Sequence, residues 1–316
     1  MGAEPAKAAL DAPSDAEGRP DGVAGSGGRT VTRRLAIDAS FDLAATLNGE
    51  QDFRWLPRAG CWHSGVLGGH LVHVRHIDGG LEYRADRNLD SLLGSYFRVD
   101  DDLDAIWGEL TAGDETLRKL HAQHGSVRLR RQPDRWECVV SYICSANRSV
   151  AGTRASVEKI AKSLGEPVEL GGDRRHIFPS VERVLEAGEE GLGGLRLGLD
   201  KHRKIVAAAR EIADGHLDLE ELAGPSVHYG EARLRLMGCE GIGPKIADCI
   251  ALFALDKLDA FPVDRWVRRA LRNRYFGGRV PSDQKLVAWA LRTFGPYAGY
   301  ANQLLFHAER EAAGTR

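Results

Sequence analysis

The chain has 316 residues, of which 43% are hydrophobic, so it is long enough to bury a sizeable core in one or two domains. Its formal net charge of -2 means that affinity for nucleic acid cannot be inferred from bulk charge, and any such surface must be a local basic patch. No apolar run approaches the ~20 residues of a membrane helix, and five scattered cysteines indicate neither a disulfide framework nor a C-x-x-C metal site.

Residues 1–28 are rich in Ala, Gly, Pro, Asp and Ser, which predicts a disordered tail. Residues 29–125 are predicted to form a small antiparallel β domain with peripheral helices. Its centre is a meander over residues 62–67, 71–77 and 81–83, because short alternating runs are separated there by Gly68-Gly69 and by Asp78-Gly79-Gly80.

Helical spacing begins after about Leu89, with apolar residues at Leu103, Ile106, Trp107 and Leu110. Residues 126–316 are predicted to be a larger, all-α domain, which gives an α+β class for the chain. Its expected helices, separated by Gly, Pro and Asp clusters, cover residues 134–147, 150–164, 180–188, 201–213, 230–238, 245–255, 264–275, 283–293 and 297–312.

The stretch from Leu236 to Leu255 has the pattern of two helices joined by a tight hairpin. Gly241-Ile242-Gly243 supplies the turn, and Pro244 suits the first position of the second helix. Two glycines let the backbone approach a phosphate, and the free N–H groups at the second helix's start favour an anion. By itself this pattern also fits an ordinary helical corner.

Two residues after the turn could carry chemistry. Lys245 stands near the N-terminus of the second helix, where the helix dipole and desolvation both disfavour an ammonium, so we expect a neutral, nucleophilic amine. Asp264 follows Phe261-Pro262-Val263 and is placed to cap the next helix. Taken singly, Lys245 also fits a solvated surface lysine, and Asp264 a simple helix cap.

The sequence resembles the 8-oxoguanine DNA glycosylases of the helix-hairpin-helix (HhH-GPD) superfamily. The resemblance runs in order from roughly residue 35 to residue 310. It is carried by the hairpin and Pro262-Val263-Asp264, and further by the segments 53–55, 62–67, 127–132, 137–138, 143–147, 178–180, 197–199, 295–299 and 305–306.

The resemblance implies a bifunctional base-excision repair enzyme acting on damaged double-stranded DNA. Lys245 would displace the damaged base at C1′ and form a Schiff base that supports strand cleavage by β-elimination. Asp264 would stabilise the cationic sugar and assist proton transfers. Two alternatives are a monofunctional glycosylase for alkylated or deaminated bases, which needs no Lys245, and a non-catalytic DNA-binding module, which needs no Asp264.

The resemblance also implies a pocket for the flipped base. Cys249, one helical turn after Lys245, and Phe306 would sandwich the base. Asn302 would read its Watson–Crick edge, and Tyr142 would line the pocket. A glycine carbonyl recognises N7 in this family; an ungapped match places Glu50 there, and a shift of one residue would restore Gly49.

Other positions are expected to contact DNA outside this pocket. The resemblance places Asn147 in the gap left by the flipped nucleotide, and the hairpin residues Gly241 and Gly243 on the phosphate backbone. The opposite-base readers correspond to Arg148, Gly152, Lys201 and His202, which puts cytosine selectivity in doubt unless Arg154 substitutes. A family histidine is replaced by Trp266. Some arginines and lysines of residues 128–131, 201–204 and 268–274 should contact phosphate.

We expect no cofactor, no metal and no iron-sulfur cluster, since the cysteine spacing that holds such a cluster in other superfamily members is missing from the sequence. A monomer without membrane association is expected. Its location would be cytoplasmic and nucleoid-associated in a bacterium, or nuclear in a eukaryote.

Overall fold

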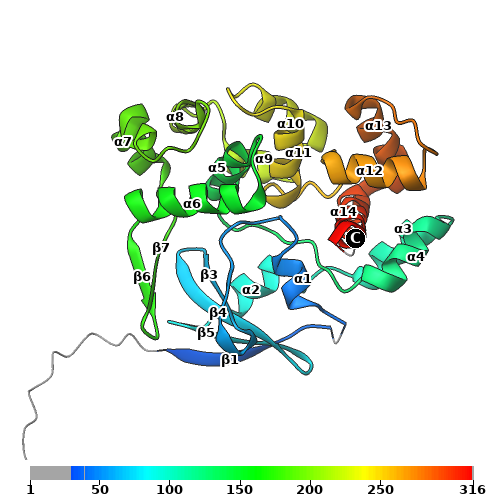
Figure 1. Cartoon of the computed structure of the whole chain (residues 1–316), viewed down its shortest axis with the longest axis horizontal. Helices are drawn as coiled ribbons and strands as arrows, with labels where there is room; N and C mark the ends of the chain where they lie inside the picture. The colour runs from blue at the N-terminus through cyan, green and yellow to red at the C-terminus, as the bar shows by residue number, and fades with distance from the viewer. Residues whose placement is uncertain (1–29, 39, 315–316) are drawn as a thin grey trace, which may run out of the picture.

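A computed structural model describes residues 30–38 and 40–314, so the predicted tail over residues 1–28 lies outside the described residues. An antiparallel sheet forms the lower part of the molecule in Figure 1, and most of the helices lie together above it. The α+β class is confirmed. None of the described helices is long and apolar enough to cross a membrane.

The main sheet has five antiparallel strands in the order β1-β5-β4-β3-β2. The predicted meander is confirmed as β3, β4 and β5, but β1 was not predicted, because a strand with three exposed positions in a row gives little alternation. A Cβ on Gly80 would lie 2.2 Å from the Leu35 carbonyl oxygen, so β1 can pair there only with a glycine. The strands are β1 (Val31–Ala36), β2 (Leu56–Pro57), β3 (His63–Leu67), β4 (His70–Ile77) and β5 (Gly80–Ala85).

One face of this sheet packs against two short helices, α1 (Leu43–Leu47) and α2 (Asp90–Tyr96). Val72 and Val74 of β4 alternate with polar residues and are fully buried, as expected for a strand with one face on a core. Together with residues of α1, α2 and the loops, they form a hydrophobic cluster of the small domain that includes Leu47, Trp55, Leu81, Tyr83, Leu93 and Phe97.

The larger domain is helical except for one β-hairpin, so its description as all-α needs correction. Strands β6 (Pro167–Leu170) and β7 (Asp173–His176) pair across Gly171-Gly172. Leu170 packs on Val66 and Leu71 of the main sheet, which ties the hairpin to the small domain. Four-residue strands rich in Asp, Glu, Arg and His carry too little hydrophobic alternation to be predicted.

The predicted helices are present, and most of their apolar faces meet in one large cluster. The short α9 and the polar α4 were not predicted, and α7 continues beyond a kink at Gly188. The helices are α3 (Leu103–Thr111), α4 (Glu115–His124), α5 (Arg135–Ser145), α6 (Val150–Leu164), α7 (Val181–Gly193), α8 (Lys201–Ala213), α9 (Leu219–Ala223), α10 (Tyr229–Met237), α11 (Pro244–Phe253), α12 (Arg265–Arg274), α13 (Asp283–Phe294) and α14 (Ala298–Gly314), with short 3₁₀ turns at Ala59–Cys61 and Gly295–Tyr297.

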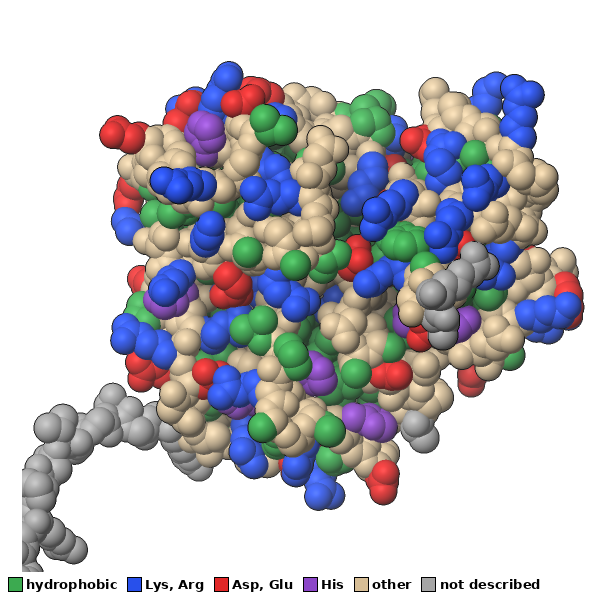
Figure 2. Space-filling model, viewed as in Figure 1, with side chains coloured by type: hydrophobic (Ala, Val, Ile, Leu, Met, Phe, Trp, Pro, Cys, Tyr) green, Lys and Arg blue, Asp and Glu red, His purple; other side chains and the backbone are tan. Residues whose placement is uncertain are grey.

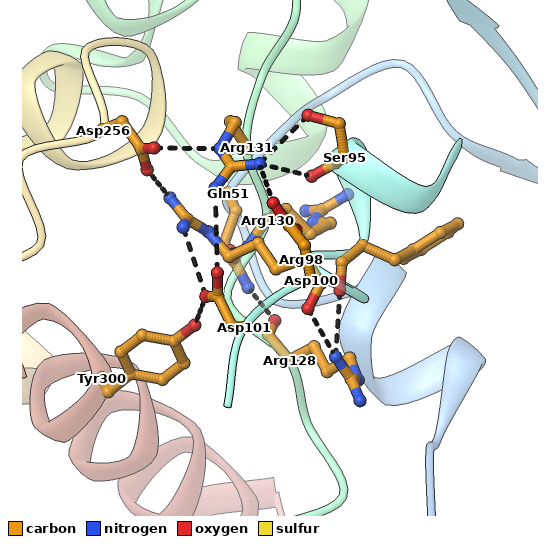
Figure 3. A network of polar contacts seen from close by, with 11 residues as sticks. Gln51, Ser95, Arg98, Asp100, Asp101, Arg128, Arg130, Arg131, Asp256 and Tyr300 are labelled. Carbon is orange, nitrogen blue, oxygen red and sulfur yellow. Dashed lines mark hydrogen bonds and ion pairs between the residues drawn. The ribbon is translucent and has the colours of Figure 1, made fainter. Parts of the chain in front are cut away.

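An arginine-rich connector, residues 128–132, runs between the two domains (Figure 3). The Arg131 Nε donates to Asp256 at 3.0 Å, and Asp256 also pairs with the buried Arg98. Arg128 is 6% exposed and Arg130 is 2% exposed. The prediction that this basic cluster contacts phosphate is therefore wrong for Arg128 and Arg130, which join the domains.

Residues 51 and 52 fasten the chain after α1 to this connector. The Gln51 side chain accepts a hydrogen bond from the Arg130 N–H at 2.7 Å and donates one to the Arg128 carbonyl at 3.0 Å. Asp52 accepts from the Trp55 indole at 3.1 Å and from the Tyr96 hydroxyl, and it lies 3.5 Å from the Arg130 guanidinium. All of these groups are buried.

Removing the Asp52 carboxylate should destabilise the protein far more than removing an exposed carboxylate. Asp52→Ala leaves the buried Arg130 charge without a carboxylate, which costs about 3 kcal/mol. Asp86→Ala, whose ion pair with Arg87 is solvent-exposed, should cost less than about 0.5 kcal/mol. Urea unfolding of both variants measures the difference, and equal losses would contradict the importance assigned to Asp52.

Candidate active site

The predicted helix-hairpin-helix is formed by α10, a turn, and α11. Gly241 has a φ of 91°, and a Cβ on it would lie 2.8 Å from the Lys204 side chain of α8. Both constraints require glycine at this position. Gly243 is the N-cap of α11, and a Cβ there would meet open space. The start of α11 is thus open to a phosphate group, as the sequence predicted.

Lys245 lies in the first turn of α11, and its side chain is directed into the protein rather than to solvent. Its Nζ is 5.3 Å from the centre of the Tyr142 ring. Cys249, one turn further along the same helix, lines the inner cavity together with Lys245. The interpretation of Lys245 as a solvated surface lysine is therefore excluded.

The charge state expected for Lys245 needs correction. Burial lowers the pKa of Lys245, but the Cys249 sulfur and the carboxylates of Asp264 and Glu50 raise it by more, so the pKa lies above its ordinary value. Burial also raises the pKa of the Cys249 thiol to about 11. Sequence reasoning associated Asp264 with this lysine, and it considered Glu50 only for the position that reads N7 of the base. The free protein therefore holds an ammonium at Lys245, which must lose a proton before it can act as a nucleophile.

Asp264 is both the N-cap of α12 and a residue of the Lys245 site. Its Oδ1 accepts hydrogen bonds from the Trp266 N–H at 2.9 Å and the Val267 N–H at 2.8 Å. Burial raises the pKa of Asp264, although these two donors and Lys245 oppose the shift. The helix-cap interpretation is correct, and it holds the carboxylate beside the lysine.

An inner cavity and an outer groove meet at these side chains. The inner cavity is small, with a volume of about 40 Å³. The outer groove is much larger, at about 980 Å³. Four residues line both spaces, namely Glu50, Tyr142, Lys245 and Asp264.

The predicted base-pocket residues gather around the inner cavity. Cys249 of α11 and Phe306 of α14 both line it, as do Asn302 and Gly49. The Asn302 amide donates to the Pro262 carbonyl at 2.9 Å, so one of its donors is already used. Gln303 also lines the cavity and was missed. Spacing along the helix could have suggested Gln303, since it lies three residues before Phe306.

Gly49 and Glu50 both reach the cavity, but they differ in backbone conformation. Glu50, not Gly49, has a left-handed φ, of 55°. The Tyr142 hydroxyl donates at 3.4 Å to the carbonyl oxygens of Glu50 and Gln51, and its ring stacks on Phe253 with centroids 5.7 Å apart. The backbone at residues 49–51 is therefore held against the Tyr142 side of the site.

The outer groove lies between the start of α6 and the start of α12. Figure 2 shows a hollow on this face, with Lys and Arg side chains standing around it. Asn147 and Arg148 line one side and Trp266 the other. The Arg148 guanidinium donates to Ser156 at 2.7 Å and to the Gly152 carbonyl at 3.2 Å. The guanidinium carbons of Arg265 and Arg269 lie 4.7 and 4.8 Å from the centre of the Trp266 ring.

Lys201 and His202 are not among the residues that line this groove. Lys201 is 5% exposed, and its Nζ donates to the carbonyl oxygens of Cys144 and Ala146. Burial lowers the pKa of Lys201. The structure therefore contradicts a direct DNA contact by Lys201, which instead joins the start of α8 to the end of α5. His202 is half-buried at the start of α8.

Within residues 30–38 and 40–314, one group of His, Cys, Asp or Glu side chains has a spacing that could hold a metal ion. It consists of His124, His307 and Glu311, with the two histidines 3.0 and 3.3 Å from Glu311. None of these residues lines the cavity or the groove. The expectations of no metal and no iron-sulfur cluster stay predictions.

Two family models together match most of the chain. The model for the 8-oxoguanine DNA glycosylase N-terminal domain matches residues 34–139, and the model for the HhH-GPD superfamily of base excision DNA repair proteins matches residues 140–292. The predicted boundary near residue 126 stays a prediction.

Individual proteins show the same similarity. The chain is 30% identical to an N-glycosylase/DNA lyase OGG1 of Arabidopsis thaliana, over 86% of this chain and 78% of the relative. It is 33% identical to a probable N-glycosylase/DNA lyase of Methanothermobacter thermautotrophicus, over 58% of this chain and 64% of the relative.

A solved structure, the Clostridium acetobutylicum 8-oxoguanine glycosylase/lyase bound to double-stranded DNA with cytosine opposite 8-oxoguanine, superimposes with a TM-score of 0.81. It is 27% identical, and the match covers 90% of this chain and 98% of that one. The two family models fit consecutive segments of the chain, and one relative is matched over most of its length. The chain therefore belongs to the 8-oxoguanine DNA glycosylase/lyase family of the HhH-GPD superfamily.

Proposed function

We propose that this chain excises 8-oxoguanine from duplex DNA and cleaves the resulting abasic site, with Lys245 as the nucleophile and Asp264 as its carboxylate partner. The observation that carries this proposal is the position of both side chains where the inner cavity meets the outer groove. A flipped nucleotide with its base in the cavity and its sugar in the groove would place C1′ beside them.

Each chemical step can be assigned to a group at this junction. The Lys245 amine attacks C1′, and the bond from C1′ to the base breaks. The C1′–O4′ bond of the sugar ring then opens, O4′ takes up a proton, and the resulting imine permits β-elimination at the sugar. The Asp264 carboxylate stabilises the cationic sugar in the transition state. Its two backbone hydrogen bonds fix its orientation before the substrate arrives.

Binding of the base requires the cavity to open. A space of about 40 Å³ cannot hold a purine, so side chains that close it must move as the base enters between Cys249 and Phe306. Arg310 is one such side chain, since it lies 5.4 Å from the Phe306 ring and pairs with Glu50 at 3.2 Å. Asn147 and Trp266 would contact the DNA on either side of the groove, and the hairpin glycines would contact its phosphates.

We propose further that the enzyme acts as a monomer. Its location would be the cytoplasm of a bacterium or the nucleus of a eukaryote. The Lys245 amine is the nucleophile and the Asp264 carboxylate is the countercharge, so the steps assigned above use side chains alone.

Lys245→Gln should abolish both base release and the covalent adduct. Borohydride traps a Schiff base, and glutamine has no amine to form one. DNA affinity should stay close to that of the wild type, because the hairpin that contacts phosphate is unchanged. Trapping on 8-oxoguanine duplexes and a binding titration measure the two effects, and an adduct formed by the variant would refute the nucleophile assignment.

Asp264→Asn should separate the carboxylate's chemical role from its structural one. Asparagine retains the side-chain oxygen that caps α12, so unfolding free energy should change by less than about 0.5 kcal/mol. Loss of the negative charge should slow single-turnover excision by about 100-fold or more. A variant that loses stability but excises at the normal rate would leave Asp264 as a helix cap only.

The opposite base should affect excision weakly. Lys201 is buried and cannot read cytosine. Arg148 is exposed, but one of its guanidinium nitrogens binds Ser156 and the Gly152 carbonyl, so Arg148 would have to give up these bonds or read the base with its remaining donors. A bidentate contact discriminates by ~1–3 kcal/mol; without such contacts, rates opposite the four bases should agree within about tenfold. Single-turnover excision from four duplexes tests this, and a strong preference for cytosine would contradict it.

A further inference from the structure

Glu50 is held in a backbone conformation that side chains other than glycine adopt rarely. Its φ of 55° is left-handed, and non-glycine residues with such angles cluster at functional sites. The conformation is imposed by its neighbours, because Gln51 binds the connector through two hydrogen bonds and Asp52 is fastened to Trp55 and Tyr96. Glycine would relieve the strain, so the glutamate side chain itself needs an explanation.

The Glu50 carboxylate faces the reacting groups. Glu50 lines the inner cavity and the outer groove, as Lys245 and Asp264 do. Its Oε1 is 3.2 Å from the Arg310 guanidinium, and its side chain is 22% exposed. The charged groups that act on it come from three helices or their caps, and they are Arg310 of α14, Lys245 of α11, and Asp264 and Arg265 at the start of α12.

No residue has yet been assigned to one step of the proposed mechanism, the removal of a proton from Lys245. Lys245 is an ammonium in the free protein, and its proton needs an acceptor before attack. Asp264 is a weak candidate, since two backbone N–H groups already bind its Oδ1 and stabilise its charged form. Among the described residues, the other carboxylate at the junction is Glu50.

We propose that Glu50 accepts the proton of Lys245 and returns it to the departing purine. This assignment rests on the proposed function of Lys245. Glu50 is suited to both transfers because burial raises its pKa above the ordinary value, while Arg310 and Lys245 partly oppose the shift. A raised pKa makes the carboxylate a better proton acceptor than an ordinary glutamate, and its position at the junction of the cavity and the groove places it beside both the amine and the base.

The proton balance closes over one cycle. Entry of the base displaces Arg310 from Glu50, and one proton passes from the Lys245 ammonium to the Glu50 carboxylate. The neutral amine then forms a bond to C1′ while the glycosidic bond breaks. The electron pair of the glycosidic bond stays on the purine. Glu50 gives its proton to that purine, and it becomes a carboxylate again. The secondary ammonium at C1′ then loses a proton to a carboxylate or water. The C1′–O4′ bond breaks as this nitrogen forms the imine, and O4′ takes up a proton in return.

The test is single-turnover excision of 8-oxoguanine between pH 5.5 and pH 10 by the full chain carrying Glu50→Gln. Glutamine keeps the size of the side chain but cannot take up the proton. The rate at pH 7 should fall about 100-fold or more, and it should recover at high pH, where solvent removes the proton from Lys245. Glu50→Gly, which suits the backbone angle, should show the same loss without a loss of stability.

Arg310→Met provides an independent readout. Arg310 lowers the pKa of Glu50, so its removal should raise that pKa. More Glu50 is then protonated in the free protein at a given pH, before the base displaces Arg310. The acid limb of the excision rate measured at subsaturating enzyme concentration, which reports the free protein, should therefore move to higher pH. In Glu50→Gln/Arg310→Met the shift should vanish, because the titrating group is gone.

The outcomes separate this assignment from the proposed function. A normal rate and pH profile in Glu50→Gln, alongside borohydride trapping that depends on Lys245, would overturn the role of Glu50 alone. A slower rate with an unchanged pH profile would also overturn it, and would indicate a contact with the base instead. Trapping that persists in Lys245→Gln would refute the proposed function itself.

Discussion

The geometry of the site depends on how the short segment after α1 is fastened to the connector between the domains. Gln51 makes two hydrogen bonds with the connector backbone, and Asp52 provides a carboxylate beside the buried Arg130. These contacts place the preceding residue, Glu50, in a left-handed conformation at the edge of the cavity. The small domain therefore contributes directly to the site, although Lys245 and Asp264 belong to the helical domain. Loss of the buried ionic contact between Asp52 and Arg130 would affect both the stability of the protein and the position of Glu50 beside Lys245.

The site balances two opposing electrostatic effects. Burial disfavours the charged form of Lys245, whereas nearby carboxylates and the Cys249 sulfur favour it, and the second effect is the larger. The same carboxylates are stabilised by the ammonium, so the free site is internally neutralised instead of holding an exposed nucleophile. Under the proposed mechanism, activation of the Lys245 amine would be part of substrate binding, when the groups around it are rearranged.

Sequence reasoning succeeded where a local pattern carries the structure. The hairpin, the meander and the cap at Asp264 each follow from turn residues, alternation and helix-start chemistry within a few positions. It failed where the outcome depends on contacts between distant segments. The prediction that Arg128 and Arg130 face DNA, and the placing of Lys201 on DNA, ignored acceptors supplied by other parts of the chain. Gln303 and the side chain of Glu50 reach the cavity through tertiary packing, which no single stretch of sequence records.

The small volume of the inner cavity has a consequence for how the protein examines DNA. A space of about 40 Å³ offers no ready receptor for a base that leaves the helix briefly. Each extruded base must first compete with Phe306 and Arg310 for room, so normal and damaged bases meet the same barrier. Only a base whose contacts compensate for that displacement remains long enough to react. Under the proposed function, the narrow pocket would act as a threshold for any base that leaves the helix.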